Sequence, residues 1–398
     1  MLKPARAAED AAGLSTTTTL LLAAACGALA ANIYYAQPLI AIIGPSVGLR
    51  PELYSLVVTL TQLGYVLGLV FVVPLGDMVE SRRSISALVL CTGAAVLGAA
   101  LAPNAWAFLL ASLMIGIFAS GLQMLVPLAA HLSPEAARGR TVGNVMSGLI
   151  MGVLLARPIA SLASEFLGWR DFFIVAAAVA AVLAALMLRT LPSRRPRDPP
   201  RYGVLIASLW QVLRRNPVLR RRMLYQAPLF GAFSLFWTAV PLELAGPSFH
   251  FTQTGIAAFA LAGAAGALSA PFAGRAADRG HTRAGTGLAI VMVIASFGLC
   301  WLGGRGSLAA LVAAAVVLDA GVQGSQLFGQ RAIYSLAPEI RSRLNGLYVA
   351  GSFVGGACGS AVASTVFIHG GWSGVAALGA GAGGLSLLAW LSELRGRP

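Results

Sequence analysis

Apolar residues gather along this chain in long uninterrupted runs rather than in the alternating or striped patterns of soluble strands and helices. Twelve of these runs approach or exceed the roughly 20 residues that an α-helix needs to cross the hydrocarbon core of a bilayer. The runs cover residues 17–43, 53–75, 85–103, 105–130, 141–167, 171–190, 223–245, 252–273, 284–303, 307–330, 343–368 and 371–392. The pattern therefore predicts an all-α membrane protein with twelve transmembrane helices.

Two clusters of charge, residues 74–83 and 271–283, interrupt the apolar pattern at related places, each directly after the end of a run. In both clusters an acid precedes an arginine by five residues. The two pairs are Asp77 with Arg82 and Asp278 with Arg283. Such an echo half a chain apart indicates an internal duplication.

A comparison of the chain with itself at an offset of 203 residues supports this duplication. The residues Gln123, Arg138, Arg140, Gly143, Gly148, Gly152, Gly168 and Trp169 fall on Gln326, Arg341, Arg343, Gly346, Gly351, Gly355, Gly371 and Trp372. Each half then holds six helices in the same orientation, which is the arrangement of parallel repeats. We predict an N-terminal half at 1–190, a basic linker at 191–222 and a C-terminal half at 223–398.

Composition and charge agree with a membrane location. The chain is 58% hydrophobic and 11% charged, with a mean hydropathy of +0.79. Of its 28 Lys and Arg residues, all but Arg50, Arg157, Arg170 and Arg305 lie at one set of alternate loops or at the termini. The positive-inside rule then places both termini and the linker in the cytoplasm, so the net charge of +14 reports orientation and no nucleic-acid partner is expected.

Several segments resemble the major facilitator superfamily, which is built from two parallel six-helix halves. Asp77, Arg82 and Arg83 resemble the acid and closing arginines of its consensus G-x-x-x-D-R-x-G-R-R, and the second cluster contains a related copy. Segments 32–39, 168–170 and 343–348 look like those of the bacterial drug- and sugar-efflux branch. This resemblance implies proton-driven export, or less often uptake, of small molecules across the bacterial inner membrane.

The charged clusters have two interpretations. The family resemblance implies a cytoplasmic gate formed by Asp77, Arg82, Arg83, Asp278 and Arg283, whose ion pairs break when the halves rock. The alternative is a solvated loop whose charges only set the topology, because exposed ion pairs contribute at most about 1 kcal/mol.

Substrate-specific residues should break the symmetry that structural residues keep. Asp319 falls on Gly116 and Arg157 falls on Ser360, so each ionisable group lacks a counterpart. An ionised group at membrane depth costs at least about 2.5 kcal/mol, and both side chains are expected to face a cavity or a partner.

Asp319 is the candidate proton carrier, because partial burial favours the protonated form of a carboxylic acid. Its alternative roles are a permanent partner of Arg157 and a helix-packing contact. Arg157 is expected either to bind an anionic substrate group or to pair with an acid or a carbonyl. The rest of the predicted cavity consists of polar and aromatic side chains. They are Asn32, Tyr35 and Gln37 in the first helix, Gln123, Trp237, and a helical stripe of Gln323, Gln326 and Gln330.

The sequence therefore predicts a secondary transporter rather than an enzyme, and its leading function is proton-coupled efflux of a small molecule by alternating access. The alternative is proton-linked uptake of an organic anion or sugar. We expect a monomer in the lipid bilayer whose partners are the substrate and protons. Four scattered cysteines and four scattered histidines indicate neither a disulfide framework nor a metal site, and no cofactor is expected.

Overall fold

The computed structural model describes residues 14–193, 201–336 and 338–395, and within these ranges regular structure consists only of helices. Short elements combine end to end into spans, such as Thr16–Ser46 and Gln253–Asp278. Among the described residues, eleven continuous helical segments are long and apolar enough to cross a membrane, and the last of them, Arg341–Glu393, is broken by a non-helical Gly371. Since that segment contains two spans, the prediction of twelve transmembrane helices is confirmed.

The helices of the N-terminal half are α2 (Thr16–Asn32), η1 (Gln37–Leu39), α3 (Ile40–Ser46), η2 (Pro51–Leu53), α4 (Leu56–Leu67), η3 (Gly68–Val72), η4 (Val73–Asp77), α5 (Ser81–Ala100), α6 (Ala105–Ala119), α7 (Leu122–Leu132), α8 (Glu135–Leu167) and α9 (Trp169–Thr190). Those that follow are α10 (Tyr202–Arg215), α11 (Pro217–Ala245), α12 (Gln253–Gly263), η5 (Ala264–Ser269), α13 (Ala270–Asp278), α14 (Thr282–Gly303), α15 (Leu308–Tyr334), η6 (Pro338–Ile340) and α16 (Arg341–Arg395).

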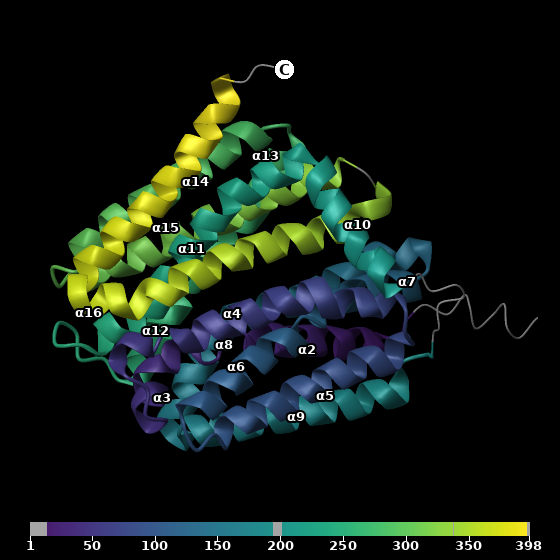
Figure 1. Cartoon of the computed structure of the whole chain (residues 1–398), viewed down its shortest axis with the longest axis horizontal. Helices are drawn as coiled ribbons and strands as arrows, with labels where there is room; N and C mark the ends of the chain where they lie inside the picture. The colour runs from purple at the N-terminus through teal and green to yellow at the C-terminus, as the bar shows by residue number, and fades with distance from the viewer. Residues whose placement is uncertain (1–13, 194–200, 337, 396–398) are drawn as a thin grey trace, which may run out of the picture.

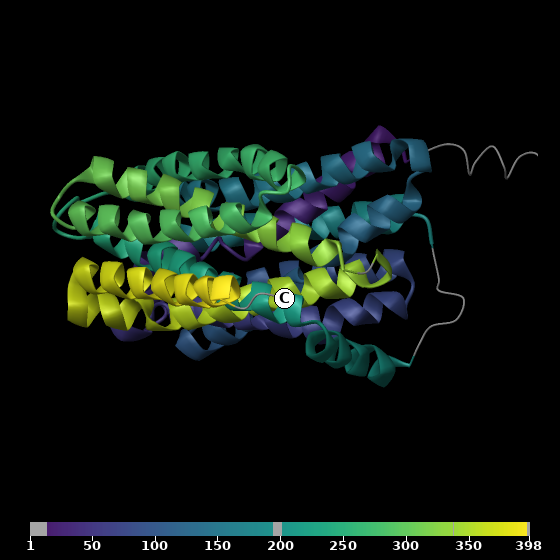
Figure 2. The same cartoon turned by 90° about the horizontal axis from the view of Figure 1, so that it is seen from above.

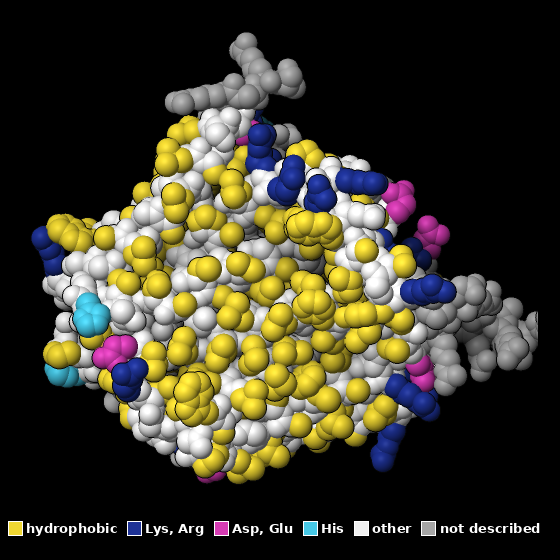
Figure 3. Space-filling view, viewed as in Figure 1, with side chains coloured by type: hydrophobic (Ala, Val, Ile, Leu, Met, Phe, Trp, Pro, Cys, Tyr) yellow, Lys and Arg dark blue, Asp and Glu magenta, His cyan; other side chains and the backbone are white. Residues whose placement is uncertain are grey.

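The two halves lie side by side with their long helices roughly along one direction (Figures 1 and 2). We call the end of the bundle where α9 stops and α11 begins the linker end, and the opposite end, with Gly168 and Gly371, the far end. Large apolar side chains such as Trp106, Leu110 and Leu385 are exposed along the bundle. Figure 3 shows this apolar surface, with most of the visible Lys and Arg side chains toward the linker end. That distribution suits a protein surrounded by lipid.

The repeat predicted from the sequence has a physical basis in helix packing. A Cβ atom on Gly152 of α8 would collide with the backbone of Gly27 in α2, and one on Gly355 of α16 would collide with the backbone of Ala227 in α11. Gly152 and Gly355 are related by the 203-residue offset, so the same close helix contact recurs in both halves. At these two positions only glycine leaves room for the neighbouring backbone, and small residues of this kind are typical of close helix contacts in membranes.

The far-end turns repeat as well. Gly168 and Gly371 have φ values of +83° and +58°, a region that side chains with a Cβ disfavour. Each is followed by a buried tryptophan: Trp169 packs edge-on against Phe108, and Trp372 donates from Nε1 to the carbonyl of Cys300 at 2.8 Å. These anchored turns fix how consecutive spans return across the bundle.

Uncharged polar groups join the two halves in the part of the bundle toward the far end. The Ser55 amide donates to Ser364 Oγ at 3.0 Å, the hydroxyls of Thr59 and Ser360 are 3.0 Å apart, and Gln62 Nε2 donates to Ser234 Oγ at 2.9 Å. We call these six residues the polar seam. Ser55 caps α4, and Thr59 and Gln62 follow at successive turns within it. The contact therefore runs along the helix and holds this part of the interface closed.

The linker contains a helix that the sequence analysis did not predict. α10 begins at Tyr202 and ends at Arg215, between the end of α9 and the start of α11 at Pro217. Figure 1 shows α10 running obliquely across the linker end between the two halves. The proposed domain boundaries at residues 190 and 223 stay predictions.

Candidate functional site

Three side chains from three helices meet at the interface of the halves. Arg157 comes from α8, Trp237 from α11 and Asp319 from α15, and their exposed fractions are 6%, 2% and 7%. Trp237 Nε1 donates a 2.8 Å hydrogen bond to Asp319 Oδ1. The Arg157 guanidinium lies 4.5 Å from the centroid of the same tryptophan ring. The two charges that break the repeat symmetry are therefore brought into one site, with an aromatic ring between them.

Arg157 is enclosed by rings and holds one hydrogen-bonded partner. Besides Trp237, the rings of Tyr34 and Phe233 lie 4.9 and 5.2 Å from the guanidinium carbon. Arg157 Nε donates to Gln37 Oε1 at 2.8 Å. The Nη2 atom is buried and has no hydrogen-bond partner in the described part of the chain. Ring faces stabilise the positive charge, but the N–H edge of the guanidinium still lacks an acceptor, which is unusual for a buried group.

The carboxylate of Asp319 has a different partner from that of Arg157. Arg157 and Asp319, both described, do not form an ion pair with each other. Asp319 instead takes its hydrogen bond from Trp237, and two glycines pack against this pair. A Cβ on Gly263 would meet the Trp237 ring, and one on Gly266 would meet the backbone of α15 and the Cβ of Asp319. The span of α12 and η5 therefore closes the site on its side.

Gln37 adds a second contact between the Arg157 side of the site and α11 of the C-terminal half. Its Nε2 atom donates to Thr238 Oγ1 in α11 at 3.3 Å, while its Oε1 atom accepts from Arg157. Gln37 is 1% exposed. A neutral amide thus bridges the charged group of one half to a hydroxyl of the other, which keeps the halves together at this depth.

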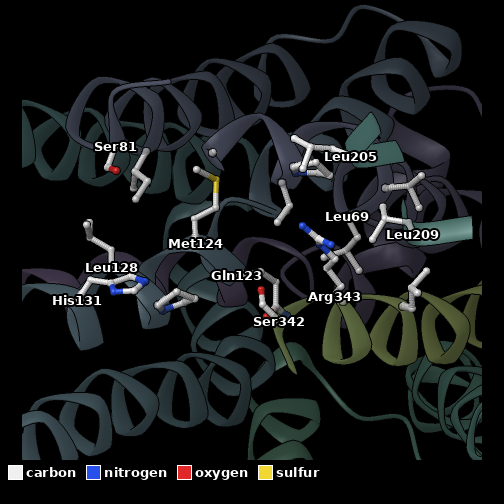
Figure 4. Close-up of a pocket in the computed structure, with 18 of the residues that line it drawn as sticks. Leu69, Ser81, Gln123, Met124, Leu128, His131, Leu205, Leu209, Ser342 and Arg343 are labelled. Carbon is white, nitrogen blue, oxygen red and sulfur yellow. The ribbon is translucent and has the colours of Figure 1, made fainter. Parts of the chain in front are cut away.

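A cavity of about 820 Å³ opens between the halves at the linker end. Gln123 and Met124 of α7, Leu205 and Leu209 of α10, and Arg343 of α16 lie around it (Figure 4). Ligand pockets usually measure about 300–1,000 Å³, so this space suits a small organic molecule.

A column of aromatic rings separates this cavity from the charged site. Tyr65 lies at the cavity end, where its hydroxyl accepts a 3.0 Å hydrogen bond from Gln123. Its ring packs 4.5 Å from that of Phe353, which packs 4.9 Å from Phe230, and Phe230 stacks 5.3 Å from Phe233. Phe233 contacts Arg157. The cavity and the charged site are consequently separate, and the packed rings fill the region between them.

The other predicted cavity residues occupy varied positions. Asn32 donates to the carbonyl of Ala28 in its own helix at 2.7 Å, and Tyr35 packs edge-on against Phe172. In the glutamine stripe, Gln330 donates to Asn345 Oδ1 at 3.1 Å, and Gln323 and Gln326 are half-buried. Among the predicted cavity residues, all within the described chain, Gln123 alone lines the linker-end cavity. Gln37, Arg157 and Trp237 form the separate charged site.

The predicted gate residues are at the linker end, and their described contacts stay within each half. The side chain of Asp77 lies outside the described residues. Arg82 and Arg83 form ion pairs of 3.3 and 3.2 Å with Glu80. In the other half, Asp278 pairs with Arg331 at 3.3 Å, and Arg283 donates to the backbone carbonyl of Glu393 at 3.0 Å. A gate that includes these residues stays a prediction.

Sequence reasoning did not assign roles to several residues of the interface and of the linker end. They are Tyr34, Phe233, Glu80 and the residues of the polar seam, Ser55, Thr59, Gln62, Ser234, Ser360 and Ser364. For the seam a signal existed, because Ser55, Thr59 and Gln62 are polar positions at helical spacing inside an apolar run. Nothing in the spacing of Tyr34 or Phe233 distinguishes them from packing residues.

Two six-helix halves that meet around a buried charged site, with a cavity between them at one end, define a membrane transporter rather than an enzyme. The chain matches the family model of the Major Facilitator Superfamily over residues 20–328 and belongs to that family.

The relatives and structural neighbours agree with this assignment. The chain is 38% identical over 366 residues to the uncharacterized transporter YgaY of Escherichia coli O157:H7, covering 92% of this chain and 93% of that protein. A probable transporter of Streptomyces coelicolor is 37% identical over 91% of this chain and 83% of its own length. The crystal structure of a mutant of the nucleoside transporter NupG has a TM-score of 0.76 at 16% identity, with 94% of this chain and 99% of that chain covered. The last similarity shows the shared fold alone.

The Trp237–Asp319 hydrogen bond predicts a measurable coupling between these residues. Trp237→Phe removes the N–H donor and keeps a ring beside Arg157, while Asp319→Asn removes the charge. Because hydrogen bonds to charged groups contribute about 1.5–3 kcal/mol, the double variant should be destabilised by less than the sum of the single variants. The measurement is a double-mutant cycle of thermal unfolding in detergent.

Trp372→Phe is the matched control for this cycle, because Trp372 is also buried but donates to the Cys300 carbonyl. Its effect should add to that of Asp319→Asn. Additive effects of Trp237→Phe and Asp319→Asn would show that the charge of Asp319 does not strengthen the hydrogen bond from Trp237, since the asparagine oxygen could still accept that bond.

Proposed function

We propose that this transporter exports small molecules in exchange for protons by alternating access, with the linker end and both termini in the cytoplasm. The surplus of arginine at the linker loops supports this orientation, since cytoplasmic loops carry an excess of Lys and Arg. A cavity that opens at the linker end is the form in which an exporter loads its substrate. A probable sugar efflux transporter of Helicobacter pylori, 26% identical over 56% of this chain and 55% of its own length, gives further support to export.

The observation that carries the proposal is the buried carboxyl group of Asp319 at the contact between the halves. An ionisable group at membrane depth is costly to keep and marks a functional site, so the Asp319 carboxyl group is suited to take up and release the coupled proton. The state of this proton changes the electrostatic balance of Arg157, which belongs to the other half. Proton binding can therefore alter how tightly the halves hold each other, which is what coupling requires.

The aromatic column gives this coupling a physical route. A substrate in the linker-end cavity meets Tyr65 and its neighbours before it reaches Arg157 or Asp319. Tyr65 belongs to the N-terminal half, whereas Phe353, Phe230 and Phe233 belong to the C-terminal half. When the halves rock, the contact between Tyr65 and Phe353 has to change. We infer that this change admits the substrate to the charged site.

A second candidate function is proton-linked uptake of an organic anion, and one observation favours it. The Nη2 atom of Arg157 is buried without a hydrogen-bond acceptor in the described chain. A carboxylate would supply that acceptor through a charge-assisted hydrogen bond. Protonation of Asp319 would leave the positive charge of Arg157 uncompensated and so favour anion binding. Proton and anion would then bind together, which is the behaviour of a symporter rather than an exchanger.

Neutralising Asp319 tests both candidates. Asp319→Asn should abolish transport driven by a pH gradient, because the amide cannot release a proton, while ligand binding persists. Ligands are first found by thermal stabilisation with drug, sugar and organic-acid libraries, since a bound ligand stabilises the native state. Transport is then measured in everted vesicles with an acidic interior. Accumulation inside the vesicles supports efflux, and its absence together with proton-linked exit supports uptake.

Two variants control this experiment. Asp171→Asn removes an exposed acid at the far end and should leave gradient-driven transport unchanged. Glu243→Gln removes another buried acid of the C-terminal half. If transport driven by the pH gradient is unchanged in Asp319→Asn, Asp319 does not carry the proton. If this transport is lost in Glu243→Gln alone, the proton is carried by Glu243.

The anion hypothesis makes a separate prediction for Arg157. Arg157→Gln should weaken the stabilisation produced by carboxylate ligands by roughly tenfold or more in affinity, because it removes a charged hydrogen bond, and should leave binding of uncharged ligands within about twofold. The measurement is the ligand concentration dependence of the unfolding temperature. Equal losses for charged and uncharged ligands would contradict an anion-binding role, and Arg170→Gln, at a far-end turn, serves as the control for lost positive charge.

A further inference from the structure

The outer face of α10 combines exposed apolar and basic side chains. Trp210 is 61% exposed and Val204 is 59% exposed, although α10 lies in the linker outside the membrane spans. Arg214 and Arg215 follow at the end of the helix, and both are exposed. Tryptophan beside arginine is the combination that proteins place at the boundary between lipid headgroups and water.

The inner face of α10 is already occupied. Leu205 and Val212 are buried, and Val212 belongs to an apolar cluster with Ile333 of α15 and Leu344 of α16. The Tyr202 hydroxyl donates a 2.8 Å hydrogen bond to the carbonyl of Phe71 in the other half. The helix is therefore anchored to both halves by one side, and its opposite side, with Trp210, is left to an external partner.

The charge of this segment indicates what that partner is. Arg201, Arg214, Arg215, Arg220 and Arg221 are exposed, and none of them forms an ion pair with a described residue. From residue 199 to residue 242 the sequence contains no acid. The surface is thus strongly basic, and these arginines have no ion-pair partner among the described residues, which complements a negatively charged surface.

We propose that the outer face of α10 binds the anionic phospholipid headgroups of the leaflet at the linker end. The guanidinium groups of Arg214 and Arg215 donate to the phosphate oxygens, and the Trp210 ring enters the headgroup region beside them. This site is independent of the transported substrate. Its consequence reaches the cavity, because Leu205 and Leu209 on the other side of the same helix line the cavity mouth. Anionic lipid holds α10 in this position across the two halves.

The test compares the full-length protein in bilayers of phosphatidylcholine with bilayers of an equal mixture of phosphatidylcholine and phosphatidylglycerol. Amide hydrogen exchange in α10 should slow by roughly tenfold in the mixture, because a ligand that binds the ordered helix opposes its local opening. The double variant Arg214→Gln/Arg215→Gln should lose this lipid-dependent slowing. Trp210→Ala should weaken protection in both bilayers.

The matched control is Arg140→Gln/Arg279→Gln, which removes two exposed arginines from the same end of the bundle but outside α10. This control should keep the slowing. Equal exchange of wild-type α10 in the two bilayers would overturn the proposal, and so would an equal loss in the control, since the effect would then follow total charge rather than this helix. Loss in Trp210→Ala without loss in the arginine variant would assign the contact to apolar insertion and also overturn it.

Discussion

The burial of two opposite charges on different halves of the molecule is the constraint on which the interface depends. Arg157 and Asp319 are both almost inaccessible to water, yet they do not touch. The Trp237 ring mediates between them by accepting the cation on its face and donating its N–H to the acid. A buried charge without compensation is costly, so the halves are held in register where all three groups meet. A change in the charge of either group disturbs that register.

The two ends of the bundle use different chemistry. Toward the far end, the polar seam joins the halves through neutral hydroxyls and amides. Each of these hydrogen bonds contributes only about 1 kcal/mol and can be exchanged for water. At the linker end, the described ion pairs stay within each half, and a cavity separates the halves. The charged site lies at about the depth of the seam, since Arg157 and the seam residue Ser360 occupy equivalent positions of the repeat. We propose that a proton at this site shifts the balance between the weak neutral closure and the open cavity.

Much of this arrangement could be predicted from the sequence, and the limits have physical causes. The spans were predictable because lipid requires long apolar runs, and Arg157 and Asp319 because an ionisable group without a mirror partner is expensive in a membrane. The ring between them was not predictable, since contacts between helices depend on packing that no spacing encodes. Trp237 was expected in the cavity wall, not as the hydrogen-bond donor to Asp319. Glu80 was overlooked beside Asp77, although it is the described partner of Arg82. α10 was missed because its arginines obscured the apolar face that packs Leu205 and Val212.

We propose that the proton on Asp319 controls the distance between the two halves at the far end. The most direct test is the distance between spin labels at Phe166→Cys and Thr254→Cys, next to the hydrogen bond that Glu165 accepts from the Thr254 amide across the halves. The labels are placed in a background whose native cysteines are serine. Acidification should shift the distance distribution of the otherwise unaltered protein, and Asp319→Asn should hold the acid distribution at every pH. A distribution in Asp319→Asn that still follows pH would show that Asp319 does not control this distance.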